Sequence, residues 1–65
     1  MTRLSARQRE VIALVADGYT NPHIARRLHL TVNTVKSHLD GIFERLGANG
    51  RAHAVALAFR SGELT

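Results

Sequence analysis

The chain has 65 residues, which leaves room for one small hydrophobic core. It has no cysteine, which excludes disulfides and thiolate metal sites, while a net charge of +4 and an isoelectric point near 11.2 favour an anionic partner such as nucleic acid. No apolar run approaches the ~20 residues of a membrane span. The N-terminal sequence MTRLSARQRE has no apolar secretion signal. We therefore expect residues 1–65 to form a single cytoplasmic domain.

The first predicted helix begins after Ser5, because Gln8 stands three residues later and completes a capping-box pattern. It ends at Asp17-Gly18. Its apolar face consists of Val11, Ile12, Leu14 and Val15.

The second predicted helix lies in the sequence TNPHIARRL and is about two turns long. Asn21 can cap it, and Pro22 suits the first helical position, where a missing N–H costs nothing. The helix ends near His29-Leu30. Ile24, Ala25 and Leu28 share one face of this helix.

Thr31 is the predicted cap of a third, longer helix that is strongly amphipathic. At about 100° per residue, its apolar residues form a narrow stripe, and its polar residues fall on the opposite side. The stripe consists of Val35, Leu39, Ile42 and Leu46, with Phe43 at its edge. A fourth helix is predicted from about Arg51 to Arg60, with Asn49 or Gly50 at its start and Ser61-Gly62 at its end.

These elements predict an all-α fold, since no segment alternates with the period of a β-strand. A short helix joined by a three-residue turn to a longer amphipathic helix is typical of a helix-turn-helix, here at about residues 21–40. The sequence therefore predicts a four-helix helix-turn-helix bundle whose third helix is the recognition helix.

The polar face of the third helix carries side chains that can read base edges. Lys36 can donate to guanine, Asn33 can make paired bonds to adenine, and Asp40 can accept from cytosine. A plain solvated surface is the alternative interpretation of this face. The predicted base-reading residues are Asn33, Lys36, Ser37 and Asp40.

This helix is close to neutral although the chain is basic. Lys36 and Arg45 are balanced by Asp40 and Glu44, whereas residues 1–27 carry a net charge of +3. Phosphate contacts supply most of the affinity for DNA and base contacts supply the specificity, so the two functions can lie on different elements. Arg26 and Arg27 are candidates for phosphate contact, with solvated surface charge as the alternative.

Four segments in register resemble the LuxR-type (NarL/FixJ, GerE-like) DNA-binding domain of bacterial regulators. They are LSARQREV, GYTNPHIARRL, TVNTVKSHL and ERLGANGRAHAVA, and the resemblance extends from Leu4 to Leu64. It implies four helices, with the third in the major groove and the fourth in a dimer contact. It places Lys36, Ser37 and Asp40 near base edges.

The resemblance also implies contacts to the DNA backbone at the helix N-termini, where free N–H groups favour anions. The backbone candidates, including the two arginines above, are Thr20, Asn21, Arg26, Arg27, Thr31, Thr34 and His38. The chain departs from the family pattern at three places. Pro22-His23 replaces a charged pair, Gly41 replaces a polar residue, and Gly50 replaces the usual cap of the last helix.

The fourth helix is apolar on two sides. Ala54, Val55 and Ala58 form one stripe, and a small domain has little room to bury a second one. The second stripe is the predicted dimer contact, with Phe59 wrapped around the core edge as the alternative. It consists of Ala52, Ala56 and Phe59.

Catalysis and metal binding are not expected. The histidines at 23, 29, 38 and 53 have no pair at i, i+4 spacing, and no phosphate-binding glycine loop is present. The predicted function is sequence-specific DNA binding as a homodimer, without cofactor, metal, membrane or small-molecule ligand, and with RNA polymerase as a further partner. The alternatives are a helical protein-interaction module that has lost DNA binding and a sigma-factor-like promoter-recognition piece.

Overall fold

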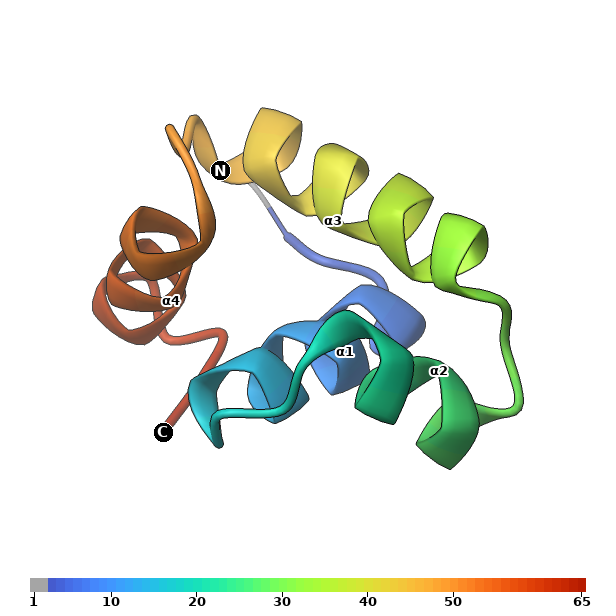
Figure 1. The fold of residues 1–65 in the computed structure, drawn as a ribbon. Helices are drawn as coiled ribbons and strands as arrows, with labels where there is room; N and C mark the ends of the chain where they lie inside the picture. Colours follow the sequence, from blue (N-terminus) through green and yellow to red (C-terminus); the bar gives the residue numbers. More distant parts are fainter. Residues whose placement is uncertain (1–2) are drawn as a thin grey trace.

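A computed structural model describes residues 3–65, which form four helices packed around one apolar core (Figure 1). The helices are α1 (Ala6–Ala16), α2 (Asn21–Leu28), α3 (Val32–Leu46) and α4 (Arg51–Arg60). No strand occurs in this described part of the chain. The predicted all-α class and the order of the helices are confirmed.

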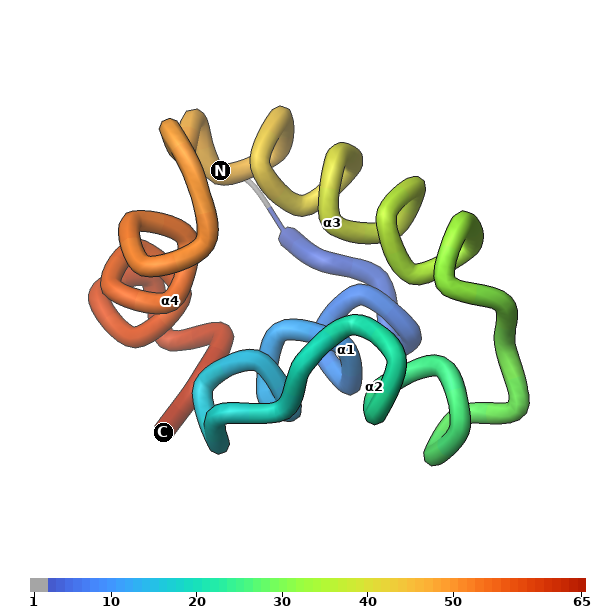
Figure 2. Tube along the Cα trace, in the orientation of Figure 1, coloured from blue at the N-terminus to red at the C-terminus, as the bar shows by residue number. Residues whose placement is uncertain are grey.

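The helix α3 organises the fold because it packs against each of the other three helices. In the tube view of Figure 2, α3 crosses the top, α1 and α2 lie below it, and α4 lies at the left. The helices α2 and α4 do not pack directly on each other. Both are therefore positioned mainly through α1 and α3.

The core is built from the apolar stripes that the sequence predicts. Val11 and Ile12 of α1, Ile24 of α2, and Val35 and Ile42 of α3 are fully buried. Burial of such aliphatic side chains contributes roughly 1.5–3 kcal/mol each. From α4 the core receives only small residues, Ala54 and Ala58.

Three helices begin with a threonine or serine cap. The Ser5 hydroxyl accepts from the Gln8 backbone amide at 3.1 Å, and the Ser5 backbone amide donates to the Gln8 side-chain oxygen at 2.9 Å, which confirms the capping box. Thr31 accepts from the Thr34 amide at 3.1 Å, as predicted. Gly50 precedes α4 and makes no side-chain cap.

The predicted cap of α2 is wrong. Thr20, one residue earlier than expected, has the extended backbone of a cap and accepts from the His23 amide at 3.4 Å. Asn21 is the first helical residue, and Pro22 follows it in the first turn, where an N–H still has no partner within the helix. The Asn21 side chain is instead bonded to Arg51 of α4.

The helices α1, α2 and α3 end in the same way, with a left-handed residue followed by a residue that bonds back five positions. Gly18 and Gly47 are the left-handed residues of α1 and α3. In α2 this position is occupied by His29, with φ 58° and ψ 45°. It is the only residue other than glycine with positive φ among residues 3–65.

Gly41 has a packing reason as well as a cost in helix propensity. A Cβ at this position would lie 3.0 Å from the side-chain nitrogen of Gln8. The same Gln8 side chain closes the capping box of α1. A glycine here lets α3 pass close to the start of α1.

Candidate nucleic-acid interface

The polar face of α3 is exposed along its length. Val35, Leu39 and Ile42 point into the core. Residues that lie about a quarter to half a turn around the helix from this buried stripe therefore face solvent. All four predicted base-reading residues are on this exposed side: Asn33, Lys36, Ser37 and Asp40.

Lys36 and Asp40 are one turn apart but do not form an ion pair. Within residues 3–65, the ion pairs are Arg7–Glu10 and Arg9–Glu63. The ammonium of Lys36 and the carboxylate of Asp40 are therefore both available to an external partner. Donor and acceptor side by side on one helix face can select between bases in a groove.

The N-termini of α2 and α3 expose two of the predicted backbone contacts, Thr20 and Thr31. Each threonine hydroxyl satisfies only one of the free N–H groups of its first turn. The Thr31 hydroxyl also bonds the half-buried Thr34 hydroxyl at 2.9 Å. His38 is half-buried on the flank of α3, between core and polar face, as predicted.

Arg51 connects the start of α4 to the start of α2, and sequence reasoning did not identify this contact. Its guanidinium donates to the Asn21 side-chain oxygen at 2.6 Å and to the Tyr19 carbonyl at 2.9 Å. The Asn21 side chain is therefore held through its oxygen. The two residues are 30 positions apart, and no periodic pattern in the sequence links residues at that separation.

A hollow of about 460 Å³ opens beside this contact. It brings together Asn21 from α2, Lys36 and Asp40 from α3, and Arg51 from α4. Residues predicted separately to contact bases and backbone thus meet on one flank of α3.

The two arginines of α2 are exposed, and Arg27 contacts Tyr19 rather than a residue of α3. The guanidinium carbon of Arg27 lies 5.4 Å from the centre of the Tyr19 ring, and Arg27 donates to the Tyr19 hydroxyl at 3.2 Å. Arg26 is exposed next to it. Both guanidinium groups are on exposed residues.

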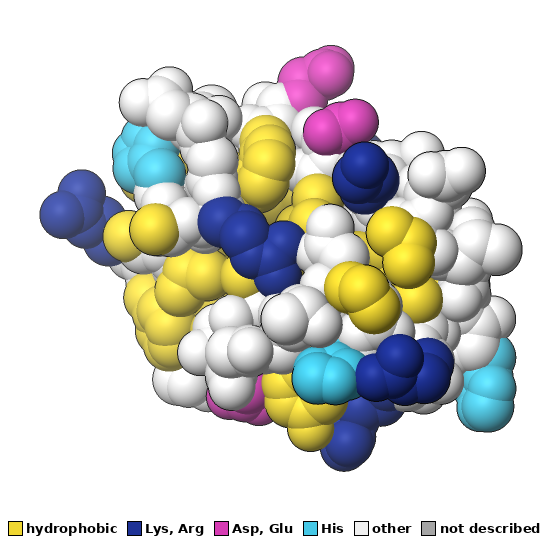
Figure 3. Space-filling model, in the orientation of Figure 1, with side chains coloured by type: hydrophobic (Ala, Val, Ile, Leu, Met, Phe, Trp, Pro, Cys, Tyr) yellow, Lys and Arg dark blue, Asp and Glu magenta, His cyan; other side chains and the backbone are white. Residues whose placement is uncertain are grey.

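Charge on this side of the molecule is mixed. Figure 3 shows acidic side chains protruding over α3, whose acidic residues are Asp40 and Glu44, with basic groups dispersed rather than gathered. The described residues hold no group of three or more His, Asp or Glu side chains that could bind a metal ion. None of the helices in residues 3–65 is long and apolar enough to cross a membrane.

The second stripe of α4 is exposed. Phe59 is 49% exposed and is one of two large apolar residues on the described surface, with Ala52 and Ala56 exposed beside it. Phe59 therefore does not wrap into the core. In the opposite stripe Ala54 and Ala58 are fully buried, and Val55 is half-buried and packs against the core.

A short helix, a tight turn and a longer helix with an exposed polar face define a helix-turn-helix domain. The family model described as "Bacterial regulatory proteins, luxR family" matches residues 2–58. The chain belongs to the luxR family of bacterial regulatory proteins, and it is a DNA-binding domain of the transcription-regulator type.

Individual relatives agree with this assignment. The chain is 50% identical over 54 residues to the probable transcriptional regulatory protein SgaR of Hyphomicrobium methylovorum, covering 83% of this chain and 26% of SgaR. It is 47% identical over 57 residues to the probable transcriptional regulatory protein NarL of Mycobacterium tuberculosis, covering 88% and 26%. The chain thus spans about a quarter of the length of the curated relatives that it matches.

Solved structures have the same fold. The transcription factor GerE superposes with a TM-score of 0.90 at 32% identity, covering 95% of this chain and 92% of GerE. The response regulator ChrA of a heme-sensing two-component system superposes with a TM-score of 0.93 at 31% identity, covering 98% of this chain and 32% of ChrA.

Proposed function

We propose that residues 1–65 act as one sequence-specific DNA-binding domain, in which α3 enters the major groove and two copies occupy paired half-sites. The observation that carries this proposal is the exposed α3 face, where Lys36 and Asp40 are unpaired with each other. A helix of 15 residues is about 22 Å long, enough to lie along a groove with its first half against the bases.

The roles within this interface follow from position. Lys36, Asn33, Ser37 and Asp40 read base edges from the exposed face. Thr20, Asn21, Thr31 and Thr34 approach phosphates at the starts of α2 and α3, where N–H groups point outward. Arg26, Arg27 and His38 contact the backbone at the margins.

The subunit contact is proposed to lie on α4, at Ala52, Ala56 and Phe59. The proposal rests on the exposure of these residues, since covering an apolar side chain as large as that of Phe59 removes apolar surface from water and stabilises the contact. Such a domain works in the cytoplasm, where bacterial DNA is, as a binding module without catalysis. RNA polymerase is a further proposed partner, because transcription regulators act on that enzyme.

The test begins with selection of bound sequences from random duplexes, followed by affinity measurements on the selected site over a series of salt concentrations. We expect a linear fall of log affinity with log salt, a sequence preference and two half-sites. A helical protein-interaction module would show no preference and no such slope. A sigma-factor-like piece would select a single site without symmetry.

Lys36→Ala should cost roughly 1–3 kcal/mol on the selected site. Arg7→Ala is the matched control, because it removes the same charge from α1, where Arg7 faces Glu10. Equal losses in the two variants would remove Lys36 from the groove.

Asp40→Ala should relax the preference at one base pair while leaving affinity for random duplex level or higher, since a negative charge leaves the neighbourhood of a polyanion. The measurement compares the selected site, its single-base variants and random duplex at one salt concentration. A uniform loss on every sequence would show that Asp40 supports the fold instead.

A further inference from the structure

A second hollow, of about 780 Å³, lies where the ends of the chain meet α3 and α4. Four arginines from separate parts of the chain line it, together with two half-buried leucines. The arginines are Arg3, Arg9, Arg45 and Arg60, and the leucines are Leu46 and Leu57. These are four of the nine Lys and Arg residues of the whole chain.

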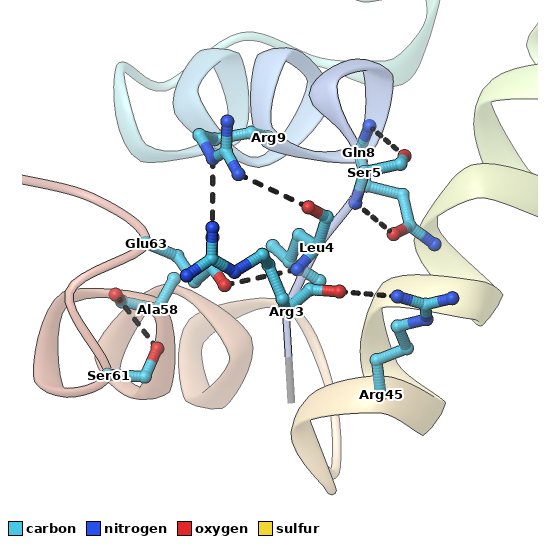
Figure 4. A network of polar contacts seen from close by, with 9 residues as sticks. All are labelled: Arg3, Leu4, Ser5, Gln8, Arg9, Arg45, Ala58, Ser61 and Glu63. Atoms are coloured by element: carbon cyan, nitrogen blue, oxygen red, sulfur yellow. Dashed lines mark hydrogen bonds and ion pairs between the residues drawn. The ribbon is translucent and has the colours of Figure 1, made fainter. Parts of the chain in front are cut away.

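One carboxylate, that of Glu63, already occupies part of this hollow (Figure 4). It accepts from the Leu4 amide at 3.0 Å and from the Arg9 side chain at 3.2 Å. These contacts, with the charges of Arg9 and Arg3, lower the pKa of Glu63, the Leu4 bond contributing most. Carboxylate chemistry therefore fits the hollow, as the chain itself demonstrates.

The remaining three arginines have no acidic partner among residues 3–65. Arg45 donates to the Arg3 carbonyl, and all three guanidinium groups are on exposed residues. After Arg9 is paired with Glu63, the hollow keeps a net charge of +3.

The hollow lies on a different side of α3 from the base-reading face. Arg45 follows Lys36 by nine residues, which is about 180° around the helix and about 13 Å along it. A duplex lying on the Lys36 face cannot also enter this hollow. DNA bound as proposed therefore leaves the arginines uncovered.

We propose that this hollow is a docking site for an acidic peptide segment of a protein partner, one that carries Asp or Glu beside an apolar side chain. Guanidinium groups bind carboxylates in pairs of parallel hydrogen bonds, which gives the three exposed arginines a natural ligand. Leu46 and Leu57 supply an apolar floor that a phosphate or a DNA backbone would not use. The peptide adds a carboxylate next to the one that Glu63 already contributes.

The test measures binding of a short fluorescent peptide of Asp, Glu and Leu to the whole chain by anisotropy. A peptide of the same length with Asn and Gln in place of the acids is the control ligand. We expect the acidic peptide to bind more tightly, and the amide signals of Leu57 and Gly62 to shift in two-dimensional NMR while those of Asn33–Ser37 do not.

The variant Arg45→Gln/Arg60→Gln should weaken the peptide roughly tenfold, since each exposed ion pair contributes up to about a factor of five. Arg7→Gln removes one equal charge outside the hollow and should change little. Arg60→Gln alone, which disturbs no hydrogen bond in the structure, repeats the test if the double variant is poorly folded.

Three results would overturn the proposal: equal binding of the neutral peptide, unchanged affinity in Arg60→Gln and the double variant, or displacement of the peptide by inorganic phosphate at constant ionic strength. The hollow would be assigned to nucleic acid instead if random duplex competes with the peptide and if the double variant loses affinity for the duplex and for the peptide to the same extent. Duplex binding is measured separately with Lys36→Ala, so failure here leaves the proposed DNA function untouched.

Discussion

Replacing Arg51 tests whether one side chain holds the start of α2 in place. The helices α2 and α4 do not pack on each other, so the two bonds from Arg51 to Asn21 and to the Tyr19 carbonyl are their direct link. A hydrogen bond to a charged group contributes about 1.5–3 kcal/mol, and partial exposure lowers this. Arg51→Met should therefore cost about 2 kcal/mol of unfolding free energy.

For a domain of this size, that loss corresponds to a fall in Tm of roughly 8–16 °C. Arg51→Lys keeps the charge but not the planar pair of donors, so we expect an intermediate loss. Denaturant unfolding followed by far-ultraviolet circular dichroism measures both variants.

The same variants distinguish a clamp from a phosphate contact. If Arg51 holds Asn21, the Met variant should weaken binding to the selected site with the salt slope unchanged. If Arg51 instead contacts phosphate, Arg51→Met should lower the slope by about one and leave unfolding nearly unchanged. That second pattern would refute the clamp.

Three further predictions concern α4, the chain ends and the end of α2. Phe59→Glu should change the unfolding free energy by no more than about 0.5 kcal/mol and should weaken cooperative binding to two half-sites, as measured by gel shift; loss of the fold would place Phe59 in the core. Because its folded-state pKa is lowered from the ordinary value of 4.5, Glu63 should add stability above that pH which is lost as pH falls through the folded pKa. A urea series over pH should therefore be flatter in Glu63→Gln, and an identical profile would contradict this role. His29→Gly should raise stability by roughly 0.5–1 kcal/mol, because glycine removes left-handed strain and loses part of the gain to chain entropy; a lower Tm would mean that the imidazole makes a compensating contact.

The helices and the core were predictable because they depend on local patterns. Ser5 and Thr31 cap the predicted helices, and the 3.6-residue period placed Val35, Leu39 and Ile42 in the core. The cap of α2 was not decided locally, since Thr20 and Asn21 are both good cap residues. The Arg51 bond occupies the Asn21 oxygen, and Thr20 is then the cap.

The exposed helix face of the candidate site was predictable from the sequence, but the contacts that bring its residues together from different helices were not. Amphipathicity identified the exposed side of α3, and the two stripes of α4 separated Phe59 from Ala54 and Ala58. The links that join elements escaped prediction, because Arg51 meets Asn21 across 30 residues and Glu63 meets Leu4 across 59. Such pairs depend on the packed geometry and leave no periodic signal.

The structure also changes how the near-neutral third helix is understood. Arg45 lines the arginine hollow, on the opposite side of α3 from Lys36. The outward face of α3 therefore carries one positive charge, on Lys36, and two negative charges, on Asp40 and Glu44, and is slightly acidic. On the proposed geometry, attraction to phosphate has to come from the helix N-termini and from α2, and a second copy doubles those contacts. A reading face that is repelled by misplaced phosphates binds well only where its donors and acceptors meet matching bases, which favours selectivity over affinity for random DNA.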